Sequence, residues 1–272
     1  MNRHNKISIL IVNYNSSAFI ENSLFALKRL TMNDFQVFIL DNNSKYCDYL
    51  KLKLIVKKYS GEIEIDLERK KHNLRGSLAH GTALNELIKK VDTPYFSILD
   101  ADATWLKKNW DEILISRFTK KIKAFGNQAP LVKPQDFPLM FAILLETETF
   151  KKLAVDFRPN DLMKNQDTGW EMREKYLAAG YTGRNIEFKN TRTYKNGPFK
   201  SIPGVDEFYL ENNYGEIFAS HFGRGSNPFA KQKIKCNNKF LSILLIPLNY
   251  YFWRRDKKNW IKSCKDIVNN QN

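Results

Sequence analysis

Short apolar runs alternate with helical patterns along the first hundred residues. Four segments are strand-like, with nearly continuous apolar runs or an apolar–polar alternation: residues 7–12, 35–40, 63–67 and 95–99. The segments between them place apolar side chains at the spacing of one helix face: residues 19–30, 49–59 and 77–91. Strands that are apolar on both faces are typical of parallel sheets. The alternation therefore predicts a doubly wound α/β fold, a mostly parallel sheet flanked by helices, with right-handed crossovers.

Polar side chains follow each of the four strand-like segments. They fall in residues 13–17, 41–44, 73–76 and 100–102. In open α/β sheets, ligands bind just beyond the carboxyl ends of the strands. We therefore expect these four segments to line one crevice.

The second half of the chain is less regular. Residues 129–138 contain prolines and predict a loop, and residues 141–145 predict a strand. Residues 147–153 predict a short helix, and residues 167–179 predict a longer one that Gly180 ends. Beyond them the sequence mixes strand-like and loop-like patterns, so it predicts no further element with a definite boundary.

Composition narrows the class of protein and points to an anionic partner. Hydrophobic residues make up 43% of the 272 residues and aromatic residues 13%, which excludes a disordered chain. Three widely spaced cysteines argue against a disulfide framework or a cysteine zinc site and fit a reducing compartment. The 44 Lys and Arg against 29 Asp and Glu give a net charge of +15. That charge suggests nucleic acid, a phosphorylated small molecule or a membrane surface as the partner.

The basic charge is densest near the C-terminal end. Residues 231–266 hold ten Lys or Arg and two Asp, so ten minus two gives +8, around an apolar and aromatic run at residues 240–253. That run is shorter than the roughly 18 residues that cross a bilayer, and the first residues lack the features of a secretory signal. We expect a cytoplasmic protein, peripheral on the inner face of the cell membrane, whose basic amphipathic segment 229–272 binds anionic lipid. The alternative is a helix that packs on the domain with a charged outer face.

Two carboxylates at the end of the fourth strand suggest a metal site. Asp100 and Asp102 follow residues 95–99 directly, at positions i and i+2. Mg²⁺ and Mn²⁺ take carboxylate and phosphate oxygens as ligands. The alternative is a plain helix N-cap before residues 105–114.

Four blocks in this order resemble the family 2 glycosyltransferases, which have the GT-A fold. They are residues 7–15 (ISILIVNYN), 37–44 (VFILDNNS), 73–76 (NLRG, with Asn85 further on) and 99–102 (LDAD). The resemblance covers about residues 7–115 and thins beyond them. It implies a GT-A domain over residues 1–228, with a nucleotide-sugar-binding half at 1–115 and an acceptor-binding half at 116–228.

The resemblance also implies roles for individual residues of the donor half. Asp41 would hydrogen-bond the nucleotide base, or else simply cap a helix. The other residues expected around the nucleotide, diphosphate and metal are Asn13, Tyr14, Asn15, Asn73, Arg75, Gly76, Asp100 and Asp102. Among these, Arg75 is equally well explained as a solvated surface residue, whereas Asp102 would bind the metal directly.

Four further candidate site residues lie in the second half of the chain: Asp167, Glu171, His221 and Arg224. An inverting enzyme needs a base for the acceptor hydroxyl, and the resemblance assigns this role to Asp167 at the predicted start of a helix, although Gln166 stands where Glu is usual. Glu171 is the alternative base, and a plain N-cap is the alternative role of Asp167. His221 would be a third metal ligand, or else a structural residue in a turn, and Arg224 would clamp phosphate.

Together these features predict a metal-dependent inverting glycosyltransferase. Its cofactor would be Mn²⁺ or Mg²⁺, its donor a nucleotide-sugar, with UDP- or dTDP-sugars favoured, and its acceptor a glycan or lipid-linked glycan in surface polysaccharide or glycolipid biosynthesis. Two alternatives are a nucleotidyltransferase-like enzyme and a nucleic-acid-binding protein. The first would want a Gly-rich loop and a basic residue after the first strand, and the second would want basic and aromatic residues interleaved on one module. Because the chain has neither pattern, we expect no nucleic-acid partner.

Overall fold

The computed structural model describes residues 6–71, 73–128, 134–161, 166–210, 216–225 and 246–271. Within these residues, ten strands form one sheet in the order β3-β2-β1-β4-β7-β6-β8-β9-β10-β5. The strands are β1 Ile7–Asn13, β2 Phe35–Asn42, β3 Glu64–Lys70, β4 Tyr95–Leu99, β5 Ala103–Trp105, β6 Ile122–Asn127, β7 Leu139–Glu146, β8 Thr182–Asn190, β9 Asp206–Tyr209 and β10 Ile217–His221. The helices are α1 Ser17–Leu30, α2 Tyr46–Tyr59, α3 Gly76–Ile88, α4 Trp110–Ile115, α5 Thr147–Lys152, α6 Met172–Ala178 and α8 Ile246–Asn269.

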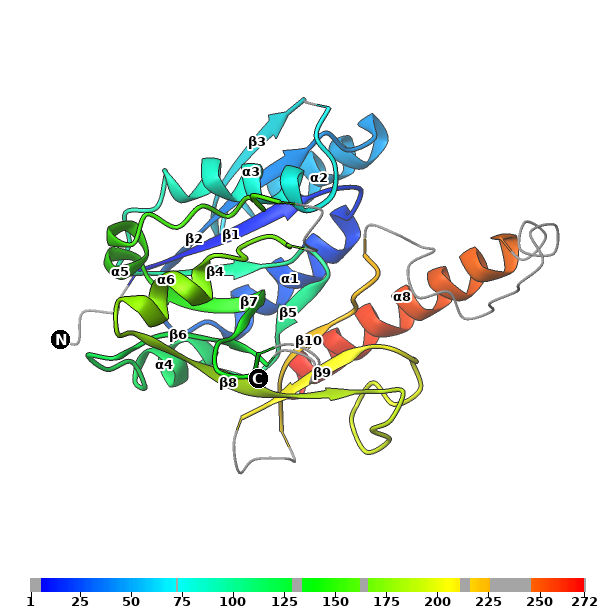
Figure 1. Ribbon diagram of the computed structural model, residues 1–272. Coiled ribbons are helices and arrows are strands. Elements are labelled where there is room, and N and C mark those ends of the chain that lie inside the picture. Colours follow the sequence, from blue (N-terminus) through cyan, green and yellow to red (C-terminus); the bar gives the residue numbers. More distant parts are fainter. Residues whose placement is uncertain are drawn as a thin grey trace.

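The first four strands are parallel neighbours, as the sequence predicts. Strand β1 pairs with β2 and β4, and β2 pairs with β3, all in parallel. All seven residues of β1 are buried, which explains its nearly continuous apolar run. The register sets Asn13 opposite Asp41, so the polar ends of β1 and β2 lie at the same edge of the sheet. The predicted α/β fold, with helices flanking a central sheet, is confirmed (Figure 1), and the predicted parallel pairing holds throughout these four strands.

The second half of the sheet is largely antiparallel and contains strands that the sequence did not predict. Strand β7 runs antiparallel to β4 and β6, and β10 runs antiparallel to β9 and β5. The short strand β5 begins directly after Asp102, where the alternative interpretation placed a helix N-cap. That interpretation is wrong, because Trp105 is buried in β5 and stacks on Trp110, at which α4 begins, with ring centroids 4.5 Å apart.

The predicted helix over residues 167–179 is shorter than expected. A turn occupies residues 168–171, and α6 begins at Met172. Gly180, with a φ of 79°, follows its end as predicted. Part of the predicted loop, residues 129–133, and the tail residues 226–245 lie outside the described residues.

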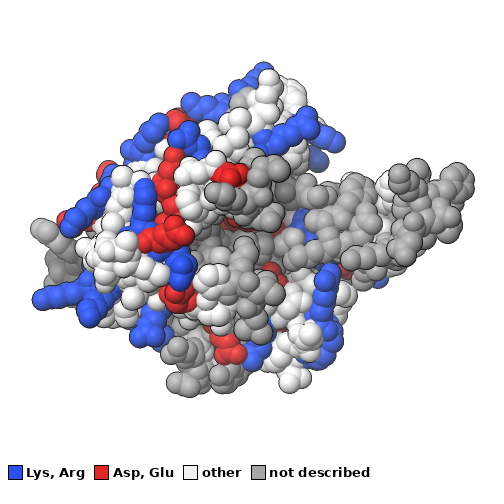
Figure 2. Space-filling view, viewed as in Figure 1, with Lys and Arg blue, Asp and Glu red and all other residues white. Residues whose placement is uncertain are grey.

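The C-terminal helix α8 has two different halves. Its second half packs against the domain, with Trp260, Cys264 and Val268 buried. Its first half extends away from the body (Figure 1) and exposes large apolar side chains: Ile246, Leu248, Tyr250 and Tyr251. Lys and Arg are spread widely over the visible face of the molecule, so basic charge is not confined to α8 (Figure 2). Among the described residues, no helix is long and apolar enough to cross a membrane.

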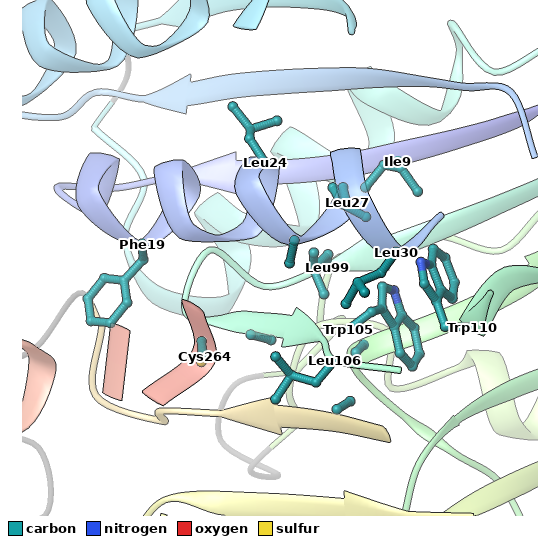
Figure 3. Packing of buried hydrophobic residues seen from close by; sticks show 14 of the residues in the cluster. Ile9, Phe19, Leu24, Leu27, Leu30, Leu99, Trp105, Leu106, Trp110 and Cys264 are labelled. Atoms are coloured by element: carbon teal, nitrogen blue, oxygen red, sulfur yellow. The ribbon is translucent and has the colours of Figure 1, made fainter. Parts of the chain in front are cut away.

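Two apolar clusters cover the two faces of the sheet. One joins the strands to α1, α4 and α8, and its aromatic residues include Phe19, Trp105, Trp110 and Trp260. Figure 3 shows Leu27 and Leu30 of α1 reaching toward Trp105 and Trp110, and Cys264 of α8 near Phe19. The other cluster joins the strands to α3, α5 and α6. The sheet is therefore buried on both faces. A binding site can form only where the strands end, at the carboxyl ends of the parallel strands.

Candidate active site

A cavity of about 830 Å³ opens at the carboxyl ends of the parallel strands. Its walls come from the ends of β1, β2 and β4, from the start of α3 and from the segment before α6, and each of the four predicted polar segments contributes: Tyr14, Asn42, Asn73 and Asp100. The predicted convergence on one crevice is thus present in the fold. Asp102 and Asp167 line the same cavity.

Asp100, Asp102 and His221 form a cluster that could hold a metal ion. One ligand atom from each lies within 4.8 Å of the others. His221 arrives here because β10 pairs antiparallel with β5, with His221 opposite Ala103. Its Nε2 lies 3.4 Å from Oδ1 of Asp102. The short strand that follows Asp102 thus brings a distant histidine to the two carboxylates.

The segment after β10 holds the Asp102 carboxylate in place. Oδ2 of Asp102 accepts hydrogen bonds from the backbone NH groups of Gly225 at 2.7 Å and Arg224 at 3.0 Å. The Phe222 NH donates to the carbonyl oxygen of Asp102 at 2.8 Å. A Cβ on residue 225 would lie only 2.6 Å from the Cβ of Asp102, so glycine is needed for this approach. One carboxylate oxygen is fixed by the backbone, and the other points toward His221.

Asp206 is a site residue that the sequence did not reveal. Its Oδ2 lies 3.4 Å from Nδ1 of His221, and the imidazole stacks on Phe141 with ring centroids 4.4 Å apart. A carboxylate on the far nitrogen orients a metal-binding histidine and strengthens it as a ligand. Asp206 lies at the start of β9, beside β10, and only the strand pairing identifies it.

The charges in this cluster favour a bound cation. Burial raises the pKa of Asp100 to about 6. Burial also acts to raise the pKa of Asp102, but the His221 charge and the hydrogen bonds outweigh it and set that pKa to about 2. Burial lowers the pKa of His221, yet Asp102 and Asp206 outweigh it and raise it to about 10. The carboxylates around His221 therefore stabilise a positive charge in this cluster, carried either by the proton on the imidazole or by a divalent cation.

Asp167 faces the cavity and is held by the start of α3. Oδ1 of Asp167 accepts a hydrogen bond from Oγ of Ser77 at 2.5 Å and from the Thr168 NH at 2.8 Å. The Thr168 hydroxyl in turn donates to the Ser77 carbonyl at 3.2 Å. Neither Ser77 nor Thr168 was singled out in the sequence, because their contact depends on how α3 lies against the segment before α6.

Glu171, the alternative base, is placed differently. It does not line the cavity. Its Oε1 accepts a hydrogen bond from the Asp156 NH at 2.5 Å and lies 2.6 Å from Nζ of Lys175. These contacts fasten α6 to the loop before it, so the geometry favours Asp167 over Glu171.

The residues expected around the nucleotide divide into two groups. The first group lines the cavity: Tyr14, Asn73, Arg75 and Gly76. Gly76 has a φ of 57°, which favours glycine, and it begins α3 with no acidic residue in the first turn. The positive end of α3 therefore faces the cavity, an arrangement that suits phosphate.

The second group is not among the residues that line the cavity. Asn13 donates through Nδ2 to Oδ1 of Asp41 at 2.7 Å, and both side chains are fully buried. Oδ1 of Asn15 accepts from the Lys45 NH at 2.9 Å. The Arg224 guanidinium is buried and lies 3.4 Å from Asp256 of α8. These side chains make contacts within the protein, and the contact of Asp41 with a base stays a prediction.

A smaller cavity of about 370 Å³ adjoins the first. The two share Asp100 and Asp167, and the second adds apolar side chains that include Phe141 and Trp170. Trp170 is held by a hydrogen bond from its Nε1 to the Arg158 carbonyl at 3.2 Å. Asp167 thus lies between the larger cavity and this more apolar one.

The motif order and this geometry agree with a comparison to known families. The model of the family "Glycosyl transferase family 2" matches residues 8–178. The chain belongs to this family. The predicted resemblance is therefore confirmed, and it extends past residue 115 to α6 and Asp167.

Individual relatives agree at lower similarity. The teichoic acid poly(glycerol phosphate) polymerase of Staphylococcus epidermidis is 28% identical over 131 residues, which are 48% of this chain and 16% of that protein. The mannosyltransferase PcManGT from Pyrobaculum calidifontis, solved with GDP-Man and Mn²⁺, superposes with a TM-score of 0.55 at 13% identity, covering 68% of this chain and 55% of that one. S. aureus TarS with UDP gives 0.51 at 17% identity, covering 67% and 58%. These superpositions show that this chain has the GT-A fold.

Proposed function

We propose that this family 2 member is an inverting glycosyltransferase that moves a sugar from a nucleotide-diphosphate-sugar to an acceptor hydroxyl. The observation that carries the proposal is that Asp100, Asp102 and Asp167 line one cavity, with His221 clustered against the first two. The cluster would hold a divalent cation that offsets the negative charge of a diphosphate, and Asp167 would supply a carboxylate that accepts the proton of the acceptor hydroxyl. Both are needed for a direct displacement at the anomeric carbon.

The donor set fits a hard divalent cation. Two carboxylates and one imidazole suit Mn²⁺ or Mg²⁺, with oxygen ligands from the donor completing the shell. When bound, the ion would neutralise the leaving diphosphate as a Lewis acid. In this assignment Asp102 and His221 would hold the ion, Asp206 would orient the imidazole, and Asp100 would contribute to the ion's site.

Asp167 would take the proton of the acceptor hydroxyl as that oxygen attacks. The hydrogen bond from Ser77 fixes the carboxylate, and its other oxygen is left to meet the acceptor. The smaller cavity would receive the acceptor sugar, with Trp170 as an aromatic surface beside it. The step is then a single displacement, with the nucleoside diphosphate leaving on the side of α3.

The relatives support a role in making a cell-surface polymer. One is a teichoic acid polymerase, and two structural neighbours were solved with UDP or with GDP-Man and Mn²⁺. We infer a nucleotide-sugar donor, with UDP- and dTDP-sugars favoured, and a glycan or lipid-linked glycan acceptor.

The first half of α8 supports attachment to an anionic membrane surface from the cytoplasmic side. Tyr251 is 61% exposed, and Arg254 and Arg255 follow it closely. Aromatic and basic side chains side by side suit a lipid headgroup layer, where each Lys or Arg adds about 1 kcal/mol. Residues 229–272 are therefore proposed as a membrane-associating segment whose second half is also part of the core.

The direct test is the release of nucleoside diphosphate from a panel of UDP-, dTDP- and GDP-sugars. We expect the wild-type protein to hydrolyse or transfer at least one donor with Mn²⁺ present, and to lose this activity in EDTA. Asp102→Ala should lose it as well. Activity that survives both EDTA and Asp102→Ala would remove the metal assignment, and no activity on any donor would count against the proposed function.

A further inference from the structure

The C-terminal helix reaches the segment that holds Asp102. The guanidinium of Arg224 is buried, with Nη2 3.4 Å from Oδ2 of Asp256, itself only 1% exposed. Trp253, one turn earlier on α8, donates from Nε1 to the Arg224 carbonyl at 2.9 Å. Helix α8 therefore contacts both the side chain and the backbone of Arg224.

The same stretch of backbone contacts the metal-binding carboxylate. The NH groups of Arg224 and Gly225 both donate to Oδ2 of Asp102. A continuous line of contacts thus runs from Asp256 and Trp253 on α8, through Arg224, to the Asp102 carboxylate. Oδ1, the oxygen that faces His221, is aimed by the two hydrogen bonds on Oδ2.

The described contacts of the Arg224 side chain outside α8 are few. Nη2 donates to the Pro203 carbonyl at 3.2 Å, and the guanidinium lies 4.6 Å from the centroid of the Phe222 ring. Neither supplies a negative charge, whereas Asp256 does. A buried charge that loses its partner is strongly unfavourable, so removal of the Asp256 charge should drive the guanidinium, and the backbone with it, out of this position.

We propose that Asp256 and Trp253 are positioning residues for the metal site, acting through the backbone of Arg224 and Gly225. They touch neither donor nor acceptor in this assignment. Docking of α8 is therefore required for the active site as well as for the core, through residues that lie between the exposed Tyr251 and the buried Trp260. The inference rests on the proposed metal role of Asp102, but its first link, from α8 to the amides, does not.

The test uses the full chain with Asp256→Asn, Trp253→Phe and a matched control, Val268→Ala. Asn keeps the size of Asp256 and removes its charge, while Phe keeps an aromatic ring and removes one hydrogen bond. Val268 is fully buried on the same helix, at its far end, so the control weakens helix packing without touching Arg224. If Asp256→Asn does not fold, Trp253→Phe carries the test.

The first readout is hydrogen–deuterium exchange of the amides of residues 224 and 225 without metal. We expect faster exchange in Asp256→Asn and Trp253→Phe than in the wild type and in Val268→Ala. Exchange that is unchanged in both variants, or equally faster in the control, would overturn the proposal.

The second readout is Mn²⁺ affinity, measured from the electron paramagnetic resonance signal of free Mn²⁺. Loss of an outer-shell partner typically weakens metal binding by about 10- to 100-fold, and we expect such a loss in Asp256→Asn, a smaller one in Trp253→Phe and none in Val268→Ala. Faster exchange with wild-type Mn²⁺ affinity would overturn the link to the metal site. A wild-type chain that binds no Mn²⁺ would instead refute the metal role in the proposed function, and the exchange result would still decide whether α8 holds the amides.

Discussion

Gly225→Ala should weaken cation binding at the proposed metal site while leaving the fold intact. The new Cβ would lie 2.6 Å from Cβ, 2.7 Å from Cγ and 2.9 Å from Oδ2 of Asp102. Such distances are below van der Waals contact, so either the carboxylate or the backbone of residue 225 must move. The 2.7 Å hydrogen bond from the Gly225 NH to Oδ2 is lost in both cases.

The size of the effect follows from that hydrogen bond. A hydrogen bond to a charged group contributes about 1.5–3 kcal/mol. Since about 1.4 kcal/mol is a factor of ten in an equilibrium constant, Mn²⁺ affinity should fall by about 10- to 100-fold. Gly61→Ala is the matched control, because a Cβ there meets no atom within 4 Å.

The assay is a Mn²⁺ titration of both variants, accompanied by a thermal melt that establishes that each is folded. We expect weak binding in Gly225→Ala and wild-type binding in Gly61→Ala. A folded Gly225→Ala protein with wild-type Mn²⁺ affinity would refute the reasoning that the backbone at residue 225 sets the Asp102 carboxylate.

Three other outcomes test separate parts of the account. In a transfer assay, Asp167→Asn should reduce sugar transfer by about 10²- to 10⁴-fold, the usual contribution of a general base, without changing nucleotide affinity. Glu171→Gln should keep most of the transfer rate, and the reverse pattern would reassign the base to Glu171. Trp260→Ala should lower the free energy of unfolding by about 3–5 kcal/mol in urea denaturation, because this fully buried ring packs 5.7 Å from Phe19, and a loss below 1 kcal/mol would mean that α8 is not part of the core. Tyr251→Ser should weaken co-sedimentation with anionic phosphatidylglycerol vesicles and leave thermal stability unchanged; equal binding by wild type and variant would argue against the exposed half of α8 as a membrane contact.

The parallel half of the fold and its crevice were predictable because each step is local. A strand buried on both faces is mostly apolar, and β1, with seven buried residues of which five are apolar, is such a strand. Polar side chains at the ends of such strands have to meet at one edge. Asp100 and Asp102 follow β4 directly, so their place in the site required no knowledge of distant contacts.

The remainder of the site depends on pairings that no local pattern encodes. Strand β5 has only three residues, and its pairing with β10 brings His221 beside Asp102. Asp206 and Ser77 contribute only because β9 lies beside β10 and α3 lies against the Asp167 segment. For His221 the family resemblance, and not the spacing, supplied the prediction.

Arg224 was assigned a role from the sequence that its surroundings in the structure do not favour. A basic residue between two glycines suggested a phosphate clamp, but its guanidinium is buried against Asp256. Asp256 stands among basic residues in a helix that reads as a charged tail, so its single acidic charge gave no sign of a buried partner. The part of Arg224 that reaches the site is its backbone NH.

The most direct test of the central assignment is a thermal-shift measurement with UDP, GDP and dTDP, each with and without Mn²⁺, on the wild type and on Asp102→Ala. A ligand at about 100 times its Kd stabilises a protein by about 2.7 kcal/mol, which for a chain of this size corresponds to roughly 5–10 °C in Tm. We predict such a rise for at least one nucleoside diphosphate with the wild type, dependent on Mn²⁺ and absent in Asp102→Ala. No rise with any of the three, or an equal rise in Asp102→Ala, would contradict the account of this cavity as a metal-dependent nucleotide-sugar site.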